Sequence, residues 1–211
     1  MAIKAMTAPV ITFSRLRMQT DGKGVTTLVC FHGCPLRCAW CINPFSFAPD
    51  TKRTDMTPKE LYDKVKVDNL YFLATGGGVT FGGGEPLLYA DFIKEFRNIC
   101  GKEWHLCAET SLNVPKENLL AAAESIDMFY VDCKDTNPEI YSRYTGKDNR
   151  NMLENLQILV DLVGAERITV RLPLIPQYNT EEDRQKSRYL LAKMGITGFD
   201  EFTYKIKSTS S

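Results

Sequence analysis

The residues best able to do chemistry are three closely spaced cysteines, Cys34, Cys38 and Cys41. Their spacing, Cys-x3-Cys-x2-Cys, brings three thiolates together without a fourth. A structural zinc site or an electron-transfer iron–sulfur cluster takes four protein ligands, whereas a [4Fe-4S] cluster held by three leaves one iron free to bind a substrate. The spacing therefore indicates an open iron–sulfur site. A zinc knuckle completed by His32 or Cys30 is the alternative.

A second motif is rich in glycine. Gly82, Gly83 and Gly84 end an apolar strand and are followed by Glu85 and Pro86. Glycines at the end of a strand let the backbone come close to a ligand and leave its N–H and C=O groups unobstructed. Because chemistry in parallel α/β folds collects at the carboxyl ends of strands, we expect this run to lie near the cysteines.

Together the two motifs resemble the radical S-adenosylmethionine (SAM) superfamily. Residues 33–44, Gly-Cys-Pro-Leu-Arg-Cys-x-Trp-Cys-x-Asn-Pro, are similar to the glycyl radical enzyme-activating branch, the pyruvate formate-lyase-activating type, and so is the Gly-Gly-Gly-Val-Thr run at 76–80. The resemblance implies one [4Fe-4S] cluster on the three cysteines and reductive cleavage of SAM to methionine and a 5′-deoxyadenosyl radical. It further implies hydrogen abstraction from a glycine of a partner glycyl radical enzyme. Such an anaerobic oxidoreductase needs a low-potential electron donor such as flavodoxin or ferredoxin.

The resemblance also assigns residues to the cofactor. In this family the Gly-Gly-Glu-Pro motif binds the amino group of SAM, and Trp40 is the aromatic residue expected to contact adenine, with Ile42 beside the same cysteine. Ordinary core packing is the alternative for Trp40. The expected cofactor-binding set is Trp40, Ile42, Gly83, Gly84, Glu85, Glu109, Asp132, Cys133, Lys134 and Arg171.

Charged residues in this set lie on or after expected strands. Glu109 and Asp132 could fix the ribose hydroxyls or hold a monovalent cation beside the SAM carboxylate, and Lys134 could neutralise that carboxylate. A solvated ion pair between Lys134 and Asp135 is the alternative. Arg171 lies in an otherwise apolar strand and needs an anionic partner, either the SAM carboxylate or Asp132.

The elements that must position these residues form a regular series. Apolar runs alternate with amphipathic segments, which is typical of βα units and a parallel sheet. After a first strand near 10–13, strands are expected at 25–31, 79–81, 105–110, 128–132, 167–174 and 201–205, with helices from 57, over 90–100 and 115–125, from 137, and over 151–163 and 180–194. Six units are too few to close an eight-stranded barrel, so we predict an open partial (β/α)6 barrel of the radical SAM type in a single domain, 1–211, with a cluster-binding loop at 30–44.

The resemblance departs from the family in two places. Residues 44–80 contain no cysteine, whereas many activating enzymes carry a ferredoxin-like insert there, so a minimal form with a single cluster is implied. The likeness also stops at the sixth strand, without the last helix and the histidine that family members place near the adenosine. A minimal form, a shortened chain and a partner that completes the site are the three alternatives.

The charge balance and the cysteine content disfavour several classes of function. Lysine plus arginine and aspartate plus glutamate number 26 each, so no net charge favours nucleic acid or an anionic membrane. The sequence shows no signal peptide or long apolar run, and three of seven cysteines are clustered as ligands, so a reduced, cytoplasmic protein is expected. Two rival functions remain. One is a radical SAM enzyme modifying a peptide side chain or a small molecule, like a deazapurine synthase. The other is a non-catalytic iron–sulfur or zinc-binding scaffold.

Overall fold

A single eight-stranded sheet organises the protein in its computed structural model, which describes residues 6–18 and 20–205. The strand order is β3-β1-β2-β4-β5-β6-β7-β8. The six strands β2, β4, β5, β6, β7 and β8 run parallel to one another. Their bounds are β2 Val25–Phe31, β4 Gly78–Gly83, β5 His105–Thr110, β6 Met128–Asp132, β7 Ile168–Leu174 and β8 Gly198–Thr203. β1, Ala8–Met18, pairs antiparallel with β2 and with β3, Thr54–Met56. The predicted open α/β sheet with six parallel strands is confirmed.

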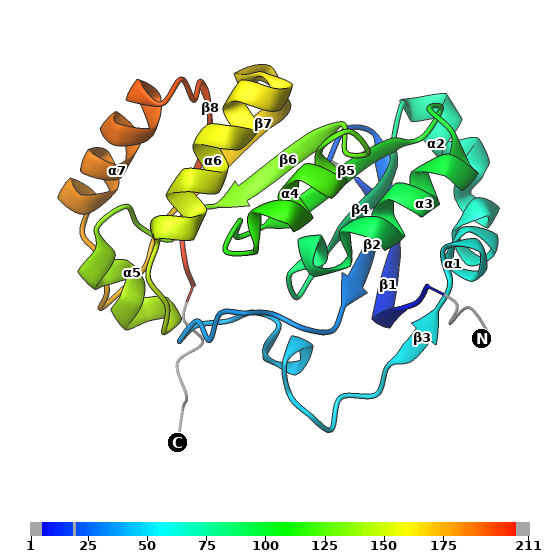
Figure 1. Cartoon of the computed structure of the whole chain (residues 1–211), viewed down its shortest axis with the longest axis horizontal. Helices are drawn as coiled ribbons and strands as arrows, with labels where there is room; N and C mark the ends of the chain where they lie inside the picture. The colour runs from blue at the N-terminus through cyan, green and yellow to red at the C-terminus, as the bar shows by residue number, and fades with distance from the viewer. Residues whose placement is uncertain (1–5, 19, 206–211) are drawn as a thin grey trace.

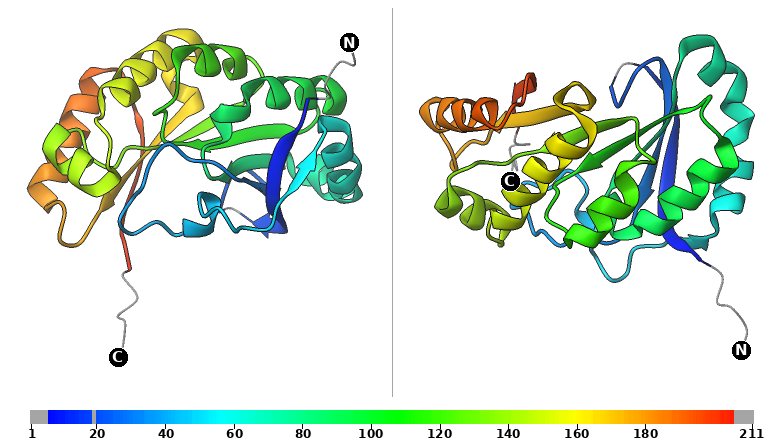
Figure 2. Two further views of the ribbon diagram at one scale, coloured as in Figure 1. Left: turned by 60° about the horizontal axis from the view of Figure 1, so that its bottom comes forward. Right: turned by 45° about the horizontal axis from the view of Figure 1, so that its top comes forward.

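The helices cover the outer side of this curved sheet, as the two views of Figure 2 show. They are α1 Pro58–Val65, α2 Asn69–Thr75, α3 Ala90–Cys100, α4 Lys116–Ala123, α5 Pro138–Thr145, α6 Arg150–Val163 and α7 Glu181–Lys193. Local sequence explains where several begin. Thr57 and Thr180 each form a capping box with the third helical residue, and Pro58 occupies the first turn of α1.

The two faces of the strands carry different residues because side chains alternate across a sheet. Leu106 and Ala108 of β5 belong to the apolar core under the helices, where both are fully buried. Cys107 and Glu109 alternate with these two residues along β5, so their side chains lie on the opposite, concave face of the sheet. Polar side chains on that inner face are therefore already aimed at the space a cofactor would occupy.

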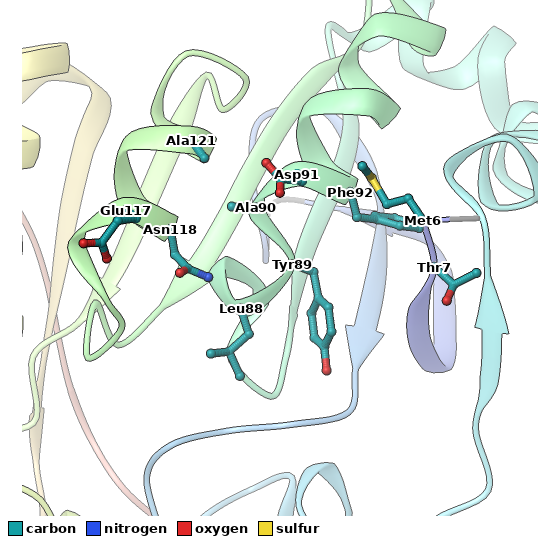
Figure 3. A pocket seen from close by; sticks show the side chains of 10 residues that line it. All are labelled: Met6, Thr7, Leu88, Tyr89, Ala90, Asp91, Phe92, Glu117, Asn118 and Ala121. Carbon is teal, nitrogen blue, oxygen red and sulfur yellow. The ribbon is translucent and has the colours of Figure 1, made fainter. Parts of the chain in front are cut away.

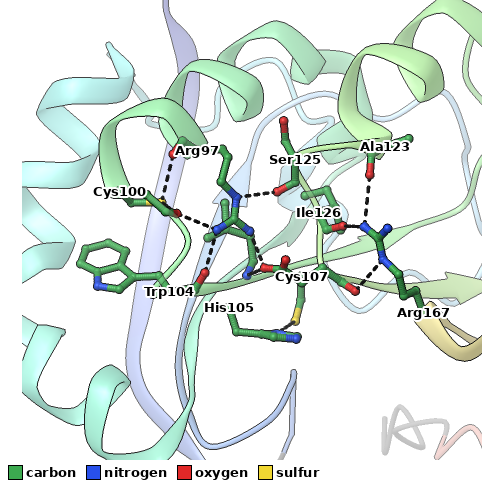
Figure 4. A network of polar contacts seen from close by, with 12 residues as sticks. Arg97, Cys100, Trp104, His105, Cys107, Ala123, Ser125, Ile126 and Arg167 are labelled. Atoms are coloured by element: carbon green, nitrogen blue, oxygen red, sulfur yellow. Dashed lines mark hydrogen bonds and ion pairs between the residues drawn. The ribbon is translucent and has the colours of Figure 1, made fainter. Parts of the chain in front are cut away.

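A polar network holds the amino ends of three parallel strands together (Figure 4). Arg97 of α3 donates to the carbonyls of Ser125 (3.0 Å) and Trp104 (2.8 Å) and pairs with Asp127. Arg167, just before β7, donates to the carbonyl of Asp127 (3.2 Å). The turns that lead into β5, β6 and β7 are thus linked by two guanidinium groups.

The structure departs from the predicted elements in four places. β3 and α2 are additional: β3 is only three residues long, and the apolar residues of α2 are largely exposed, so neither produces a periodic signal. β8 begins at Gly198 rather than at 201, because its pairing with β7 tolerates a residue type that strands disfavour. β1 extends to Met18, well beyond 10–13. The ends of the predicted 1–211 domain, 1–5 and 206–211, lie outside the described residues. In the described part, no helix is long and apolar enough to cross a membrane.

Candidate functional site

A cavity of about 120 Å³ lies at the carboxyl ends of the parallel strands, next to the loop that follows β2. Figure 1 shows this loop passing below the sheet, from the end of β2 towards α5. The three cysteines and every predicted cofactor residue except Cys133 line the cavity. Residues that the sequence did not indicate also line it: Leu36, Asn43, Thr110, Ser111, Tyr144 and Tyr204.

The cysteine loop is fastened to the end of α5 by its backbone. The amide of Arg37 donates to the carbonyl of Thr145 (2.8 Å), and the amide of Ala39 donates to the carbonyl of Tyr144 (3.0 Å). Cys38 therefore lies between two backbone hydrogen bonds. These two bonds fix this part of the loop against the end of α5.

Burial makes Cys34 and Cys38 harder to deprotonate. It raises the pKa of Cys34 to about 12 and that of Cys38 to about 11, so both are neutral thiols at pH 7 until a metal displaces their protons. Three thiols without a fourth ligand in the same cavity are the donor set of an open iron–sulfur cluster. These residues fit such a cluster.

The zinc alternative finds its extra ligands engaged elsewhere. His32 Nε2 lies 3.0 Å from the carbonyl of Ala48, and Cys30 is buried beneath Gly83 and does not line the cavity. Over residues 6–18 and 20–205, no three His, Cys, Asp or Glu side chains, the cysteine triad included, converge as ligands of one metal ion would. In a [4Fe-4S] cluster each cysteine would instead bind a different iron.

The glycines that end β4 are required by the chain itself. A Cβ on Gly84 would lie 2.1 Å from the carbonyl oxygen of Gly33, and one on Gly83 would lie 2.7 Å from Cβ of Cys30. Gly83 also has a φ of +85°, which disfavours any residue with a side chain. The glycine run thus lets β4 pack against the start of the cysteine loop, a role additional to the predicted approach of a ligand.

The buried Glu85 side chain connects the end of β4 to the end of β5 by hydrogen bonds. Its carboxylate accepts hydrogen bonds from the Thr110 hydroxyl (2.6 Å), the Ser111 hydroxyl (2.7 Å) and the Ser111 amide (2.8 Å). Burial raises the pKa of Glu85, and these donors oppose that rise. The contacts fix the residues that follow β5 next to the glycine end of β4.

The cationic side chains of the cavity have acidic partners that differ from those predicted. Arg171 Nη2 lies 2.8 Å from Oε1 of Glu109, and Lys134 Nζ lies 3.1 Å from Oδ2 of Asp132. The alternative pair between Lys134 and Asp135 is not formed. Asp135 instead accepts from the amide of Asn137 (2.8 Å). Arg171 Nε also lies 3.7 Å from Oδ2 of Asp200. Lys134 and Arg171 still have further donors that remain available to a ligand.

The charges around Glu109 bear on the predicted monovalent cation. Burial raises the pKa of Glu109, and the neighbouring Arg171 guanidinium opposes that rise. The pair with Arg171 already neutralises this carboxylate, so a cation between Glu109 and Asp132 is not required by charge balance.

Cys133 is the one predicted cofactor residue that the structure does not bring to the cavity. Its side chain is fully buried in the apolar core, because strand alternation turns it away from its neighbours Asp132 and Lys134. Among the unpredicted lining residues, Tyr204 directly follows β8, so the strand-end rule could have found it. Tyr144 lies on α5, and no sequence signal points to it.

A larger hollow of about 410 Å³ opens on the outer surface beside the starts of α3 and α4 (Figure 3). Asp91 and Glu117 border it, together with the exposed side chains of Met6 and Leu88. None of the predicted site residues lines it. The smaller cavity is therefore the one that carries the candidate chemistry.

Comparison with known proteins identifies the family of the chain. The family model of the radical SAM superfamily matches residues 28–187, more than half of the chain. The chain is 28% identical to the (2S)-3-sulfopropanediol dehydratase activating enzyme of Klebsiella oxytoca, over 76% of this chain and 69% of that one. It is 29% identical to the pyruvate formate-lyase-activating enzyme of Staphylococcus aureus, over 77% and 67%.

Solved structures agree on the fold. Streptococcus suis SuiB bound to S-adenosylmethionine superposes with a TM-score of 0.62 at 17% identity, over 83% of this chain and 39% of that chain. The chain thus spans well under half the length of SuiB. The anSMEcpe enzyme with bound AdoMet superposes with a TM-score of 0.56 at 16% identity, over 85% and 52%. With the cysteine triad, the strand-end cavity and the matching family model together, the chain belongs to the radical SAM superfamily.

Proposed function

We propose that the chain is a glycyl radical enzyme-activating enzyme that uses one [4Fe-4S] cluster and SAM. The observation that carries this proposal is a single cavity lined by three thiols, two glycines and two paired cations. When bound, the reduced cluster and SAM would supply a 5′-deoxyadenosyl radical that takes a hydrogen atom from a glycine of the partner. The chain's own task is to hold both groups and to exclude water and competing donors.

Each group of residues has a defined part in this task. Cys34, Cys38 and Cys41 hold the cluster. Lys134 and Arg171 face the carboxylate of SAM, and charge-assisted hydrogen bonds from such fixed cations are the strong ones in a partly dry cleft. The backbone at Gly83 and Gly84 takes the amino group, while Trp40 packs against adenine. No general base is required, because the transferred species is a hydrogen atom.

A protein loop is the substrate that the rim of the cavity favours. Ile42 borders the cavity and is 80% exposed, so the apolar rim is uncovered in the chain alone. An exposed apolar side chain at the mouth of a site suits a macromolecular partner better than an enclosed metabolite. The curated relatives named above are activating enzymes, which supports the same partner class. The electron donor would be a flavodoxin or a ferredoxin.

Two rival functions have less support. For the peptide-modifying rival, the chain resembles SuiB, which has been solved bound to a precursor peptide, but that likeness at 16% identity concerns the fold alone. A non-catalytic scaffold would not need the three thiols, the glycine backbone and the two cations to line one cavity.

The proposal is tested by mixing the anaerobically reconstituted protein with its cognate glycyl radical enzyme, SAM and a strong reductant. We expect 5′-deoxyadenosine and an electron paramagnetic resonance doublet from the remaining α-hydrogen of the partner glycine. A partner in which that glycine is replaced by alanine is the control and should give no doublet. Deoxyadenosine formed rapidly with a small metabolite, and never with the partner, would favour the small-molecule rival.

A further inference from the structure

Two buried hydrogen-bond donors at the cavity have no partner in the described part of the chain. They are the Tyr144 hydroxyl and Nε1 of Trp40. Tyr144 is only 1% exposed, so water does not replace the missing partner. A buried polar group without a hydrogen bond destabilises the fold. Such a group facing a cavity points to an acceptor that the polypeptide itself does not supply.

Backbone contacts place the end of α5 beside Cys38. The carbonyl of Tyr144 accepts from the amide of Ala39 (3.0 Å), and the carbonyl of Thr145, the next residue of α5, accepts from the amide of Arg37 (2.8 Å). The end of α5 is therefore bound to the residues on both sides of Cys38. Cys38 and Tyr144 line the same cavity. The sulfur of Cys38 becomes a strong acceptor when it is a thiolate.

Tyr204 is the other candidate acceptor. Its ring centroid lies 6.4 Å from that of Tyr144. Burial, and after it the neighbouring Tyr204 phenol, raise the pKa of Tyr144, so the two hydroxyls are near each other. They nevertheless do not meet the geometry of a hydrogen bond. The hydroxyl of Tyr204 already accepts from Nζ of Lys134 (3.0 Å). Tyr204 is thus held by the lysine and leaves the hydroxyl of Tyr144 unpaired.

We propose that the Tyr144 hydroxyl donates a hydrogen bond to the Cys38 sulfur when that thiolate holds the cluster, and that it thereby raises the cluster's reduction potential. This inference rests on the proposed function, because it requires the cluster. Hydrogen bonds to cluster sulfurs stabilise the reduced state, which carries the extra negative charge, and so they raise the potential. Tyr144 is then a tuning residue and takes no part in the hydrogen transfer.

The experiment compares Tyr144→Phe with Tyr141→Phe. Both tyrosines are buried on α5, but the Tyr141 hydroxyl is bonded to Nδ2 of Asn113 (3.2 Å) and the residue does not line the cavity. Reconstituted proteins are titrated electrochemically without SAM, with the reduced cluster followed by electron paramagnetic resonance. For Tyr144→Phe we expect a reduced-to-oxidised ratio about tenfold lower at a fixed potential, a shift of about 59 mV for one electron. Tyr141→Phe should titrate like the wild type.

Stability supplies an internal check. Removing an unpaired hydroxyl should leave the thermal unfolding midpoint of metal-free Tyr144→Phe unchanged or higher, whereas Tyr141→Phe should lose stability with its bond to Asn113. If Tyr144→Phe does not retain the cluster, the hydrogen bond to the cluster is tested in the wild-type protein instead. Its Fe–S stretching bands in resonance Raman spectra should shift between H2O and D2O.

Each result has one meaning. An unchanged potential in Tyr144→Phe with its cluster intact overturns the inference, and weaker SAM binding in that variant would assign the hydroxyl to SAM instead. Fe–S bands of the wild type that do not respond to D2O overturn it as well. A wild type that binds no iron after anaerobic reconstitution removes the proposed function itself, which distinguishes that failure from the failure of this inference.

Discussion

The two ends of the parallel strands both gather polar groups, but they satisfy them differently. At the amino ends of β5, β6 and β7, Arg97 and Arg167 donate to backbone carbonyls and to Asp127, so their bonds are made within the protein. The Thr26 hydroxyl near the start of β2 is an exception, because it is buried without a partner. At the carboxyl ends, Trp40 and Tyr144 keep donors without protein partners. A network satisfied internally stabilises the fold, whereas unsatisfied donors reserve bonding capacity for a ligand.

This difference predicts that substitutions at the two ends affect separate properties. The amino end should control the free energy of unfolding, and the carboxyl end should control metal and cofactor binding. Partly buried carbonyls at the amino end are costly to leave without their donor. The Trp40 and Tyr144 donors at the carboxyl end already lack protein partners, so their removal should cost less stability than function.

The largest effect is expected at the cysteine loop. Replacing any one of Cys34, Cys38 or Cys41 by alanine should reduce iron from about four atoms per chain to a trace, because two thiolates do not hold a [4Fe-4S] cluster. Cys100→Ala is the control, since Cys100 lies at the end of α3 away from the cavity. Iron and sulfide analysis after anaerobic reconstitution measures the effect. Wild-type protein that retains one zinc and no iron would contradict it.

The next largest effect is expected at the amino end. Arg97→Ala should lower the free energy of unfolding by about 2–4 kcal/mol, because the carbonyls of Ser125 and Trp104 lose a charged donor and Asp127 loses its ion pair. Urea denaturation of the metal-free protein measures this. The matched control is Arg150→Ala, which removes an exposed ion pair and should change stability by less than about 1 kcal/mol. Iron content of the folded Arg97 variant should match the wild type, and a loss of iron would break the separation of the two ends.

The smallest of the three effects is expected at the cation pair of the cavity. Lys134→Ala should weaken SAM binding by about 1.5–3 kcal/mol, the value of one charge-assisted hydrogen bond. Equilibrium binding to the reconstituted protein measures it, with iron analysis alongside. Lys186→Ala, on the exposed side of α7, should bind SAM like the wild type. Unchanged affinity in Lys134→Ala would mean that the carboxylate of SAM lies elsewhere.

The fold was largely predictable because its pattern is regular. Alternating apolar strands and capped helices indicate parallel βα units, and the six parallel strands follow in the predicted order. β3 and α2 were not predicted, because their residues carry no periodic apolar signal. Leu70 of α2, for example, is 74% exposed. Edge pairing and local contacts form these elements, and a single sequence does not reveal them.

The candidate site was predictable only as far as strand ends and motifs reach. The cysteines and glycines were found by spacing, and Glu109 and Lys134 by their place near strand ends. The pairing of cations with carboxylates could not be predicted. Arg171 of β7 contacts Glu109 of β5 across the intervening strand β6, and this contact depends on the tertiary fold. The position of Tyr144 depends on how α5 packs against the cysteine loop, which is a tertiary contact.

The sheet that stops short of closing also leaves an outer edge at β8. Among the described residues no further strand pairs with this edge, and exposed main-chain groups of this kind readily recruit strands from other molecules. Asp200 and Glu201 lie exposed on β8, and Arg188 binds Glu201 at 2.6 Å. A strand that docked there would have to bury these carboxylates, so the same residues that border the open barrel also oppose its aggregation.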